Sequence, residues 1–197
     1  MAKIEELEEQ IVKLKKEIER LKKENQRLAQ LAKIDALTNL HNKYSIGCIL
    51  EEEINYASRH DIPLTIIMID INKFKMINDT YGHLAGDKIL ICLGKILKNL
   101  RKYDQAGRFG GDEFLVVLRN TTEDGSRAVA ERLIKNMEQL DYQHEKNKIK
   151  VSISLGIARW QKGEGVFELI ERADQALYQA KHLGNNKIMI ANSTNTD

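Results

Sequence analysis

Residues 64–70 read Leu-Thr-Ile-Ile-Met-Ile-Asp, a short apolar run rich in β-branched side chains that follows Pro63. Such a run predicts a strand buried on both faces, because a strand with one face in water would alternate apolar and polar residues. The run ends in a carboxylate, Asp70. The sequence therefore predicts a buried strand that delivers an acidic side chain to one edge of a sheet.

Further helix and strand patterns surround this run. The spacing of apolar residues predicts helices over 43–60, 86–100, 123–140 and 166–182, and strands over 105–109, 113–119, 149–158 and 187–191. Gly110 and Gly111 provide a tight turn between the strands over 105–109 and 113–119. The order β, α, β, β, α, β predicts an α+β fold with a palm-like, ferredoxin-like split βαβ sheet and helices over one face.

A heptad pattern over residues 3–29 precedes these elements. Its a positions hold Ile4, Ile11, Ile18 and Asn25, and its d positions hold Leu7, Leu14, Leu21 and Leu28. Ile at a with Leu at d favours a parallel two-stranded coiled coil, and one buried Asn disfavours other registers. We expect residues 1–33 to form a dimerisation helix, natural or engineered as a leucine zipper, and residues 34–197 to form one domain. The alternative is a single solvated helix of alternating charge, which leaves the apolar seam unexplained.

Composition narrows the class of protein. The chain has 197 residues, of which 42% are hydrophobic, enough for one well-buried domain with an appended segment. Its formal net charge is only +2, so no strong overall field points to nucleic acid or to an anionic membrane. No apolar run approaches the roughly 20 residues that a membrane-spanning helix needs. Cys48 and Cys92 lie among aliphatic residues, which favours a reducing compartment, the cytoplasm.

Asp70 and Asp112 are the first candidates for chemistry. They are far apart in sequence, but neighbouring central strands of a split βαβ sheet bring them together. Magnesium is usually held by one or two carboxylates together with substrate phosphates, as in palm-like nucleotidyl transferases. Gly110 and Gly111 let the backbone approach a ligand with no side chain in the way. Taken alone, a Gly-Gly-Asp-Glu turn is also what an ordinary hairpin loop contains.

Several ordered motifs accompany these carboxylates. They are Asp-x-Leu-Thr-x-Leu-x-Asn at 35–42, the polar block at 70–87, Arg-x-x-Asp at 101–104, Arg-Phe-Gly-Gly-Asp-Glu-Phe at 108–114, Ser-x-Gly at 154–156 and Ala-Asp-x-Ala-Leu-Tyr-x-Ala-Lys at 173–181. Together they resemble the GGDEF-domain diguanylate cyclases, whose name residues 110–114 spell. The resemblance covers roughly residues 34–191, and it implies a catalytic role for the domain over 34–197.

The resemblance implies metal and catalytic roles for five residues. Asp70, the backbone carbonyl of Ile71 and Asp112 match the ligands of Mg²⁺, with Mn²⁺ as a substitute. Asp112 also matches the acceptor of the 3′-hydroxyl proton, and Glu113 belongs to the same catalytic signature. Lys75 matches a lysine near the phosphates, where a fixed cation stabilises charge on the transferring phosphoryl oxygens. The alternative for Lys75 is a solvated surface lysine.

The resemblance also implies substrate contacts. Asn78, His83 and Asp87 match the residues that hold guanine, and a carboxylate suits that base because N1–H and the N2 amino group are both donors. The alternative for Asp87 is a helix N-cap. Arg108 and Lys181 match phosphate-contacting positions, and as isolated residues they are typical surface charges.

Arg101 and Asp104 match the family's inhibitory product-binding site. Arginine offers a donor fork to phosphate and guanine acceptors, and an aspartate accepts from guanine N1–H and N2–H. The alternative is an i, i+3 ion pair at a helix end, which contributes little.

Four positions depart from the family pattern. Asn72 replaces a frequent second acid, Asn39 replaces a glycine and Lys43 replaces an arginine. Asn185 replaces an arginine after Gly184, which removes one phosphate contact. We expect Asn72 to matter little, because Asp70 and Asp112 remain, and Asn185 to matter most, because a phosphate contact is lost.

The function that the resemblance implies is synthesis of cyclic di-GMP from two GTP by a homodimer, with release of two pyrophosphates and feedback by the product. A rival of another class is a catalytically silent GGDEF-like receptor for cyclic di-GMP or GTP, which a degraded signature would mark. A coiled-coil scaffold with an inert globular end is a third reading, and it explains none of the polar motifs.

Overall fold

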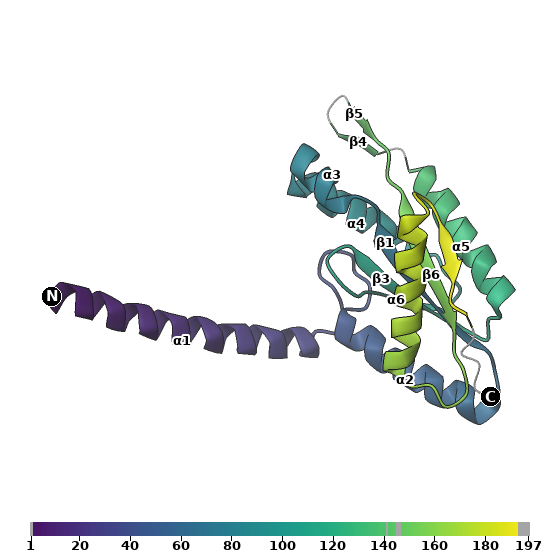
Figure 1. The fold of residues 1–197 in the computed structure, drawn as a ribbon, viewed down its shortest axis with the longest axis horizontal. Coiled ribbons are helices and arrows are strands. Elements are labelled where there is room, and N and C mark those ends of the chain that lie inside the picture. The colour runs from purple at the N-terminus through teal and green to yellow at the C-terminus, as the bar shows by residue number, and fades with distance from the viewer. Residues whose placement is uncertain (1, 141, 145–146, 193–197) are drawn as a thin grey trace. The chain divides into compact units, whose positions relative to one another are not determined.

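The structure is a computed structural model that describes residues 2–140, 142–144 and 147–192. The chain divides into two compact units, Met1–Lys33 and Ile34–Asp197. The first unit contains one long helix, α1 (Ala2–Leu31), drawn in purple in Figure 1. The apolar heptad side chains that the structure describes are about half exposed, and they are Leu7, Ile11, Leu14, Ile18, Leu21 and Leu28. The side chains of Ile4 and Asn25 lie outside the described residues.

The second unit is built on a five-stranded sheet with the order β2-β3-β1-β6-β7 (Figure 1). The strands are β1 (Leu64–Ile71), β2 (Gln105–Arg108), β3 (Glu113–Arg119), β6 (Ile153–Arg159) and β7 (Ile188–Ile190). β1 is antiparallel to β3 on one side and to β6 on the other, and β7 adds a parallel edge to β6. The four strands β2, β3, β1 and β6 have the predicted split βαβ order, so the predicted α+β fold is confirmed.

Helices cover both faces of this sheet. On one face α4 (His83–Lys98) and α5 (Glu123–Glu138) pack against Ile67 and Ile69 of β1. On the other face α2 (Lys43–His60) and α6 (Val166–His182) pack against Ile66 and Met68. The prediction of helices over one face was therefore wrong. Because all eight residues of β1 are buried, each face of the strand needs an apolar cover.

Most predicted elements are present, and the differences are local. α4 begins at His83 and ends at Lys98, so Asp87 lies inside the helix and the N-cap alternative for it is wrong. A short helix, α3 (Phe74–Tyr81), was not predicted. The strand predicted over 149–158 is also wrong at its start, because β6 begins at Ile153. Ile149 instead belongs to β5 (Asn147–Ile149), which pairs with β4 (Tyr142–His144) in a separate two-stranded sheet.

The helices of the described residues include no segment that is both long and apolar enough to cross a bilayer.

Candidate active site

The acidic residues meet at one edge of the sheet because of the strand register. Asp70, near the end of β1, is the Cα partner of Glu113 on β3 and of Ser154 on β6. The next residue, Ile71, donates its backbone N–H to the carbonyl of Asp112 at 3.4 Å. The predicted metal ligands and Glu113 are thus brought together, although Asp70 and Asp112 are separated by two helices and a strand along the chain.

Asp70 is buried and carries an ion pair. The Nζ atom of Lys181, in the last turn of α6, lies 2.6 Å from Asp70 Oδ2. Burial raises the pKa of Asp70 above its ordinary value; Lys181 opposes this rise, and the nearby carboxylates of Asp112 and Glu113 add to it. Lys181 is therefore an ion-pair partner of the proposed metal ligand in this structure and not an isolated surface charge.

The turn between β2 and β3 occupies residues 109–112. The backbone N–H groups of Phe109 and Gly110 both donate to the carbonyl of Glu113, at 2.8 and 3.1 Å. A Cβ atom on Gly110 would lie 2.5 Å from Glu113 Oε2, so a side chain there would push the carboxylate of Glu113 away. The glycine therefore lets Glu113 fold over the turn that presents Asp112.

Arg108 connects this turn to Asp35 through hydrogen bonds. Its Nε and Nη2 donate to the carbonyl of Gly111 at 3.1 and 2.7 Å, and its Nη1 donates to Asp35 Oδ2 at 3.4 Å. The other oxygen of Asp35 accepts from the backbone N–H and the hydroxyl of Thr38, at 2.8 and 2.7 Å. Burial by itself would raise the pKa of Asp35, but the Thr38 and Arg108 donors hold that pKa below its ordinary value. Sequence reasoning missed this link between the turn at residues 35–38 and the glycine turn.

The predicted guanine-binding residues lie on two consecutive helices that begin just after β1. Asn78 belongs to α3, whereas His83 and Asp87 belong to the first two turns of α4. The Oδ1 atom of Asn78 is buried and has no hydrogen-bond partner among the described residues. A Cβ atom on Gly86 would overlap that oxygen, so the glycine makes room for the amide. A buried polar atom without a partner fits a site that a ligand donor completes.

Lys75 is exposed in the first turn of α3, a few residues beyond the end of β1.

Asn72, between the strand and this helix, makes contacts that its position in the family pattern did not suggest. Its Nδ2 donates to Ser152 Oγ at 3.1 Å, and its Oδ1 accepts from Ser154 Oγ at 2.7 Å. Its backbone N–H also donates to the carbonyl of Ser152 at 2.9 Å. Asn72 therefore fastens the end of β1 to the start of β6.

Arg101 and Asp104 lie in the turn between α4 and β2. This turn starts beyond the end of α4, so the two residues do not form a helical i, i+3 pair; the N–H of Asp104 donates to the carbonyl of Arg101 at 2.9 Å. Burial raises the pKa of Asp104, and the N–H and the charge of Arg101 oppose that rise.

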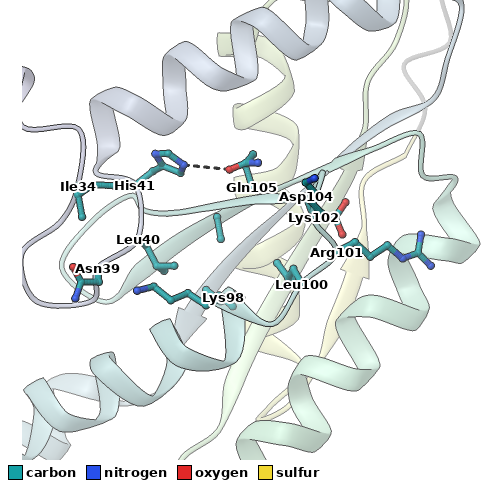
Figure 2. A pocket seen from close by; sticks show the side chains of 12 residues that line it. Ile34, Asn39, Leu40, His41, Lys98, Leu100, Arg101, Lys102, Asp104 and Gln105 are labelled. Carbon is teal, nitrogen blue, oxygen red and sulfur yellow. Dashed lines mark hydrogen bonds between the residues drawn. The ribbon is translucent and has the colours of Figure 1, made fainter.

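Both residues line a pocket of about 250 Å³ that the turn shares with Ile34 and residues 39–41. Figure 2 shows this pocket, with the hydrogen bond from His41 to Gln105 on its upper side.

The donor set at the sheet edge fits a magnesium ion. Within the described ranges, no three His, Cys, Asp or Glu side chains gather as a metal-binding group. Two carboxylates, Asp70 and Asp112, and the main-chain carbonyl of Ile71 remain. Magnesium keeps several waters and takes its other ligands from substrate phosphates, so this small set of oxygens suits it.

Comparisons with known proteins agree on one family. The family model described as "Diguanylate cyclase, GGDEF domain" matches residues 32–187. Diguanylate cyclase A of Treponema denticola is 40% identical over 169 residues, which are 83% of this chain and 46% of that protein. Diguanylate cyclase DosC of Escherichia coli K12 is 38% identical over 157 residues, 79% of this chain and 34% of that protein. The chain thus spans less than half the length of these curated relatives.

Solved structures share the fold. The GGDEF domain of DgcB from Caulobacter crescentus, in complex with c-di-GMP, gives a TM-score of 0.78 at 27% identity, covering 82% of this chain and 94% of that one. Diguanylate cyclase SiaD from Pseudomonas aeruginosa, in complex with its activator SiaC, gives a TM-score of 0.79 at 31% identity, covering 93% of this chain and 71% of that one.

Proposed function

The chain belongs to the GGDEF family of diguanylate cyclases, and from that premise we propose that it condenses two GTP into cyclic di-GMP as a homodimer that holds one GTP per domain. The observation that carries the proposal is the register that sets Asp70 beside Glu113 and ties Ile71 to Asp112. A nucleotidyl transferase needs oxygen ligands for a divalent cation next to a proton acceptor, and this edge of the sheet has both.

The proposed metal ligands are Asp70, the carbonyl of Ile71 and Asp112, which would hold Mg²⁺ or Mn²⁺. A bound divalent cation neutralises phosphate charge as the α-phosphate is attacked. Asp112 accepts the proton of the 3′-hydroxyl of the GTP in its own domain. The 3′-oxygen of this GTP then bonds to the α-phosphorus of the GTP held by the second domain of the dimer. The bond from this phosphorus to the bridging oxygen breaks, and pyrophosphate leaves. Two such steps close the ring of cyclic di-GMP.

Three cations face the triphosphate in this proposal. Lys75 is exposed at the start of α3, where its flexible side chain reaches a phosphate. Arg108 already gives three of its five N–H groups to Gly111 and Asp35, so it offers the substrate the remaining two. Lys181 is the third cation, beside Asp70. Glu113, folded over the turn, completes the catalytic group.

Guanine would be held by Asn78, His83 and Asp87. The unpaired Oδ1 of Asn78 is an acceptor for the base's amino group, and Asp87 accepts from N1–H and N2–H. Adenine offers no such donor pair at this edge, so bound ATP would leave a carboxylate unpaired.

Dimerisation belongs to this proposal because one domain holds only half of the reacting atoms. The half-exposed apolar seam of α1 supports a parallel coiled coil, which would give the second half-site a high effective concentration. Free Cys48 and Cys92 support a reducing compartment, the cytoplasm, where GTP is available.

The test is incubation of the whole chain with GTP and Mg²⁺, followed by chromatographic separation of the nucleotides. We expect cyclic di-GMP and pyrophosphate from the unchanged chain and neither from Asp112→Ala. Asp124→Ala, an exposed acid on α5, is the matched control and should retain activity. Tight binding of cyclic di-GMP or GTP without any product would instead identify the silent receptor.

A further inference from the structure

Lys181 forms an ion pair with Asp70, whereas a lysine that only binds phosphate would not need to contact a metal-binding carboxylate. The Nζ atom lies 2.6 Å from Asp70 Oδ2, on the carboxylate that we assign to the metal. The Asp70 side chain is only 10% exposed, whereas that of Lys181 is 38% exposed. Asp112 and Glu113 lie near enough for their charges to act on Asp70. The ammonium of Lys181 is therefore paired with a carboxylate on which the charges of Asp112 and Glu113 also act.

We propose, on the basis of the proposed function, that Lys181 is the resident counter-ion of the metal site. In the nucleotide-free protein its ammonium neutralises Asp70 and competes with a divalent cation for Oδ2. When a divalent cation arrives with GTP, Lys181 leaves Asp70 and turns to the triphosphate. The affinity of the metal site for divalent cations is thus lowered until substrate is present.

The physical reason is that a charged, nearly buried carboxylate is costly without a partner. The ammonium of Lys181 offsets this cost for Asp70 before substrate binds. An ammonium at hydrogen-bond distance and a divalent cation cannot use the same face of Oδ2, and their like charges repel strongly at that separation. Whichever cation binds this face of Oδ2 therefore excludes the other from it and weakens its binding nearby.

The packing allows the side chain of Lys181 to move while its backbone stays. α6 rests directly on β6 at Gly156, where a Cβ atom would overlap the carbonyl of Ala173 and the N–H of Leu177. The backbone of Asp70 is held near the end of the central strand β1 by its partners Glu113 and Ser154. The lysine is the mobile member of the pair, because its four-carbon stem is flexible and its side chain is more exposed.

This inference predicts that removing the charge of Lys181 raises the affinity for a divalent cation and lowers the affinity for GTP. Lys181→Met removes the competitor, so Mn²⁺ should bind the nucleotide-free chain about tenfold more tightly than it binds the unchanged chain. The same variant should bind GTP more weakly, because one cation for the triphosphate is gone. A lysine that only contacts phosphate would lower GTP affinity and leave Mn²⁺ affinity unchanged.

The experiment is a titration of the whole, nucleotide-free chain with Mn²⁺, followed by the EPR signal of unbound Mn²⁺. Lys187→Met is the matched control, since it removes an exposed positive charge six residues along the chain and should titrate as the unchanged chain does. Adding Asp70→Asn to Lys181→Met should abolish the gain in Mn²⁺ affinity, and this result would locate the bound ion at Asp70. Lys181→Gln keeps a hydrogen-bond donor without the charge and serves if the methionine variant does not fold.

Equal or weaker Mn²⁺ binding by a folded Lys181 variant would overturn the inference. So would a gain of the same size in Lys187→Met. Because the titration contains no GTP, its answer does not depend on whether the chain synthesises cyclic di-GMP. Failure of the proposed function would appear separately, in the chromatography of the complete reaction.

Discussion

At the scale of single residues, Asp87 is the proposed determinant of base selectivity. It lies within α4, half-buried, and the helix begins four residues before it, so capping does not explain the carboxylate. We expect Asp87→Ala to raise the KM for GTP at least about tenfold and to narrow the preference for GTP over ATP, because a charge-assisted pair of hydrogen bonds is lost. Steady-state kinetics with both nucleotides measure this. Lys88→Ala, the exposed neighbour, should change neither value, and unchanged selectivity in Asp87→Ala would remove the base-reading role.

Arg101 belongs to a different part of the surface, the pocket in Figure 2. We expect Arg101→Ala to raise the cyclic di-GMP concentration that half-inhibits synthesis by about tenfold, since an arginine fork to a phosphate is strong and charge-assisted. Basal turnover should persist, and inhibition of the unchanged chain should be non-competitive with GTP. Titrating product into initial-rate assays of Arg101→Ala and of the exposed α4 control Lys95→Ala measures the difference. Identical curves for all three proteins would leave Arg101 as a surface charge.

The sequence located the acidic centre but not the contacts that hold it. Asp70 and Asp112 were predictable because one ends an unmistakable apolar run and the other follows a pair of glycines. The bonds from Asn72 to the serines of β6 and from Arg108 to Asp35 were not predictable. These contacts depend on strand register and on side-chain direction, and neither leaves a periodic signal in one sequence.

At the scale of elements, Arg108 links two turns, because it donates hydrogen bonds both to Asp35 and to the carbonyl of Gly111. Asp35→Asn keeps an oxygen for Thr38 but removes the charge that faces Arg108. We expect kcat to fall about tenfold with little change in Tm, because the brace on Gly111, next to Asp112, is loosened. Thermal unfolding and kinetics of the two variants Asp35→Asn and Thr38→Val measure this.

Thr38→Val is the informative comparison. It deletes one donor to Asp35 and leaves the pair with Arg108, so it should lower Tm while kcat stays close to that of the unchanged chain. If both variants lost stability equally and neither lost activity, Asp35 would only close its own turn.

Helices with long periodic faces were predicted well, and short or interrupted elements were not. The bounds of α2 and α6 agree with the predicted ranges, because each carries several turns of apolar spacing. α3 spans only eight residues, with Ile77 as its buried residue, too little for a period to show. The start of β6 was placed too early because apolar residues continue back to Ile149. The break is instead set by tertiary contacts of Ser152 with Asn72.

At the scale of the whole molecule, the proposed reaction needs two domains and the helix α1 is the proposed means of joining them. Deleting residues 1–30 should make specific activity fall steeply on dilution, as dimer formation becomes limiting. Activity assays over a range of protein concentrations, with sedimentation at each, measure this. The double change Leu14→Asn and Leu21→Asn keeps the length of the chain and should act in the same way. An equally tight dimer without the segment would assign dimerisation to the globular domain.

The central position of β1 also governs how the protein is made. Its two neighbours, β3 and β6, are encoded well downstream of it, with β6 ending at Arg159. A nascent chain on the ribosome therefore carries its most apolar strand unpaired until both partners have left the exit tunnel, and such a strand is prone to aggregation. Premature termination before Ile153 yields a polypeptide in which Asp70 has no neighbouring strand on one side. Leu64–Ile71 is therefore the strand of this domain that we expect to be most exposed to aggregation until β6 has emerged.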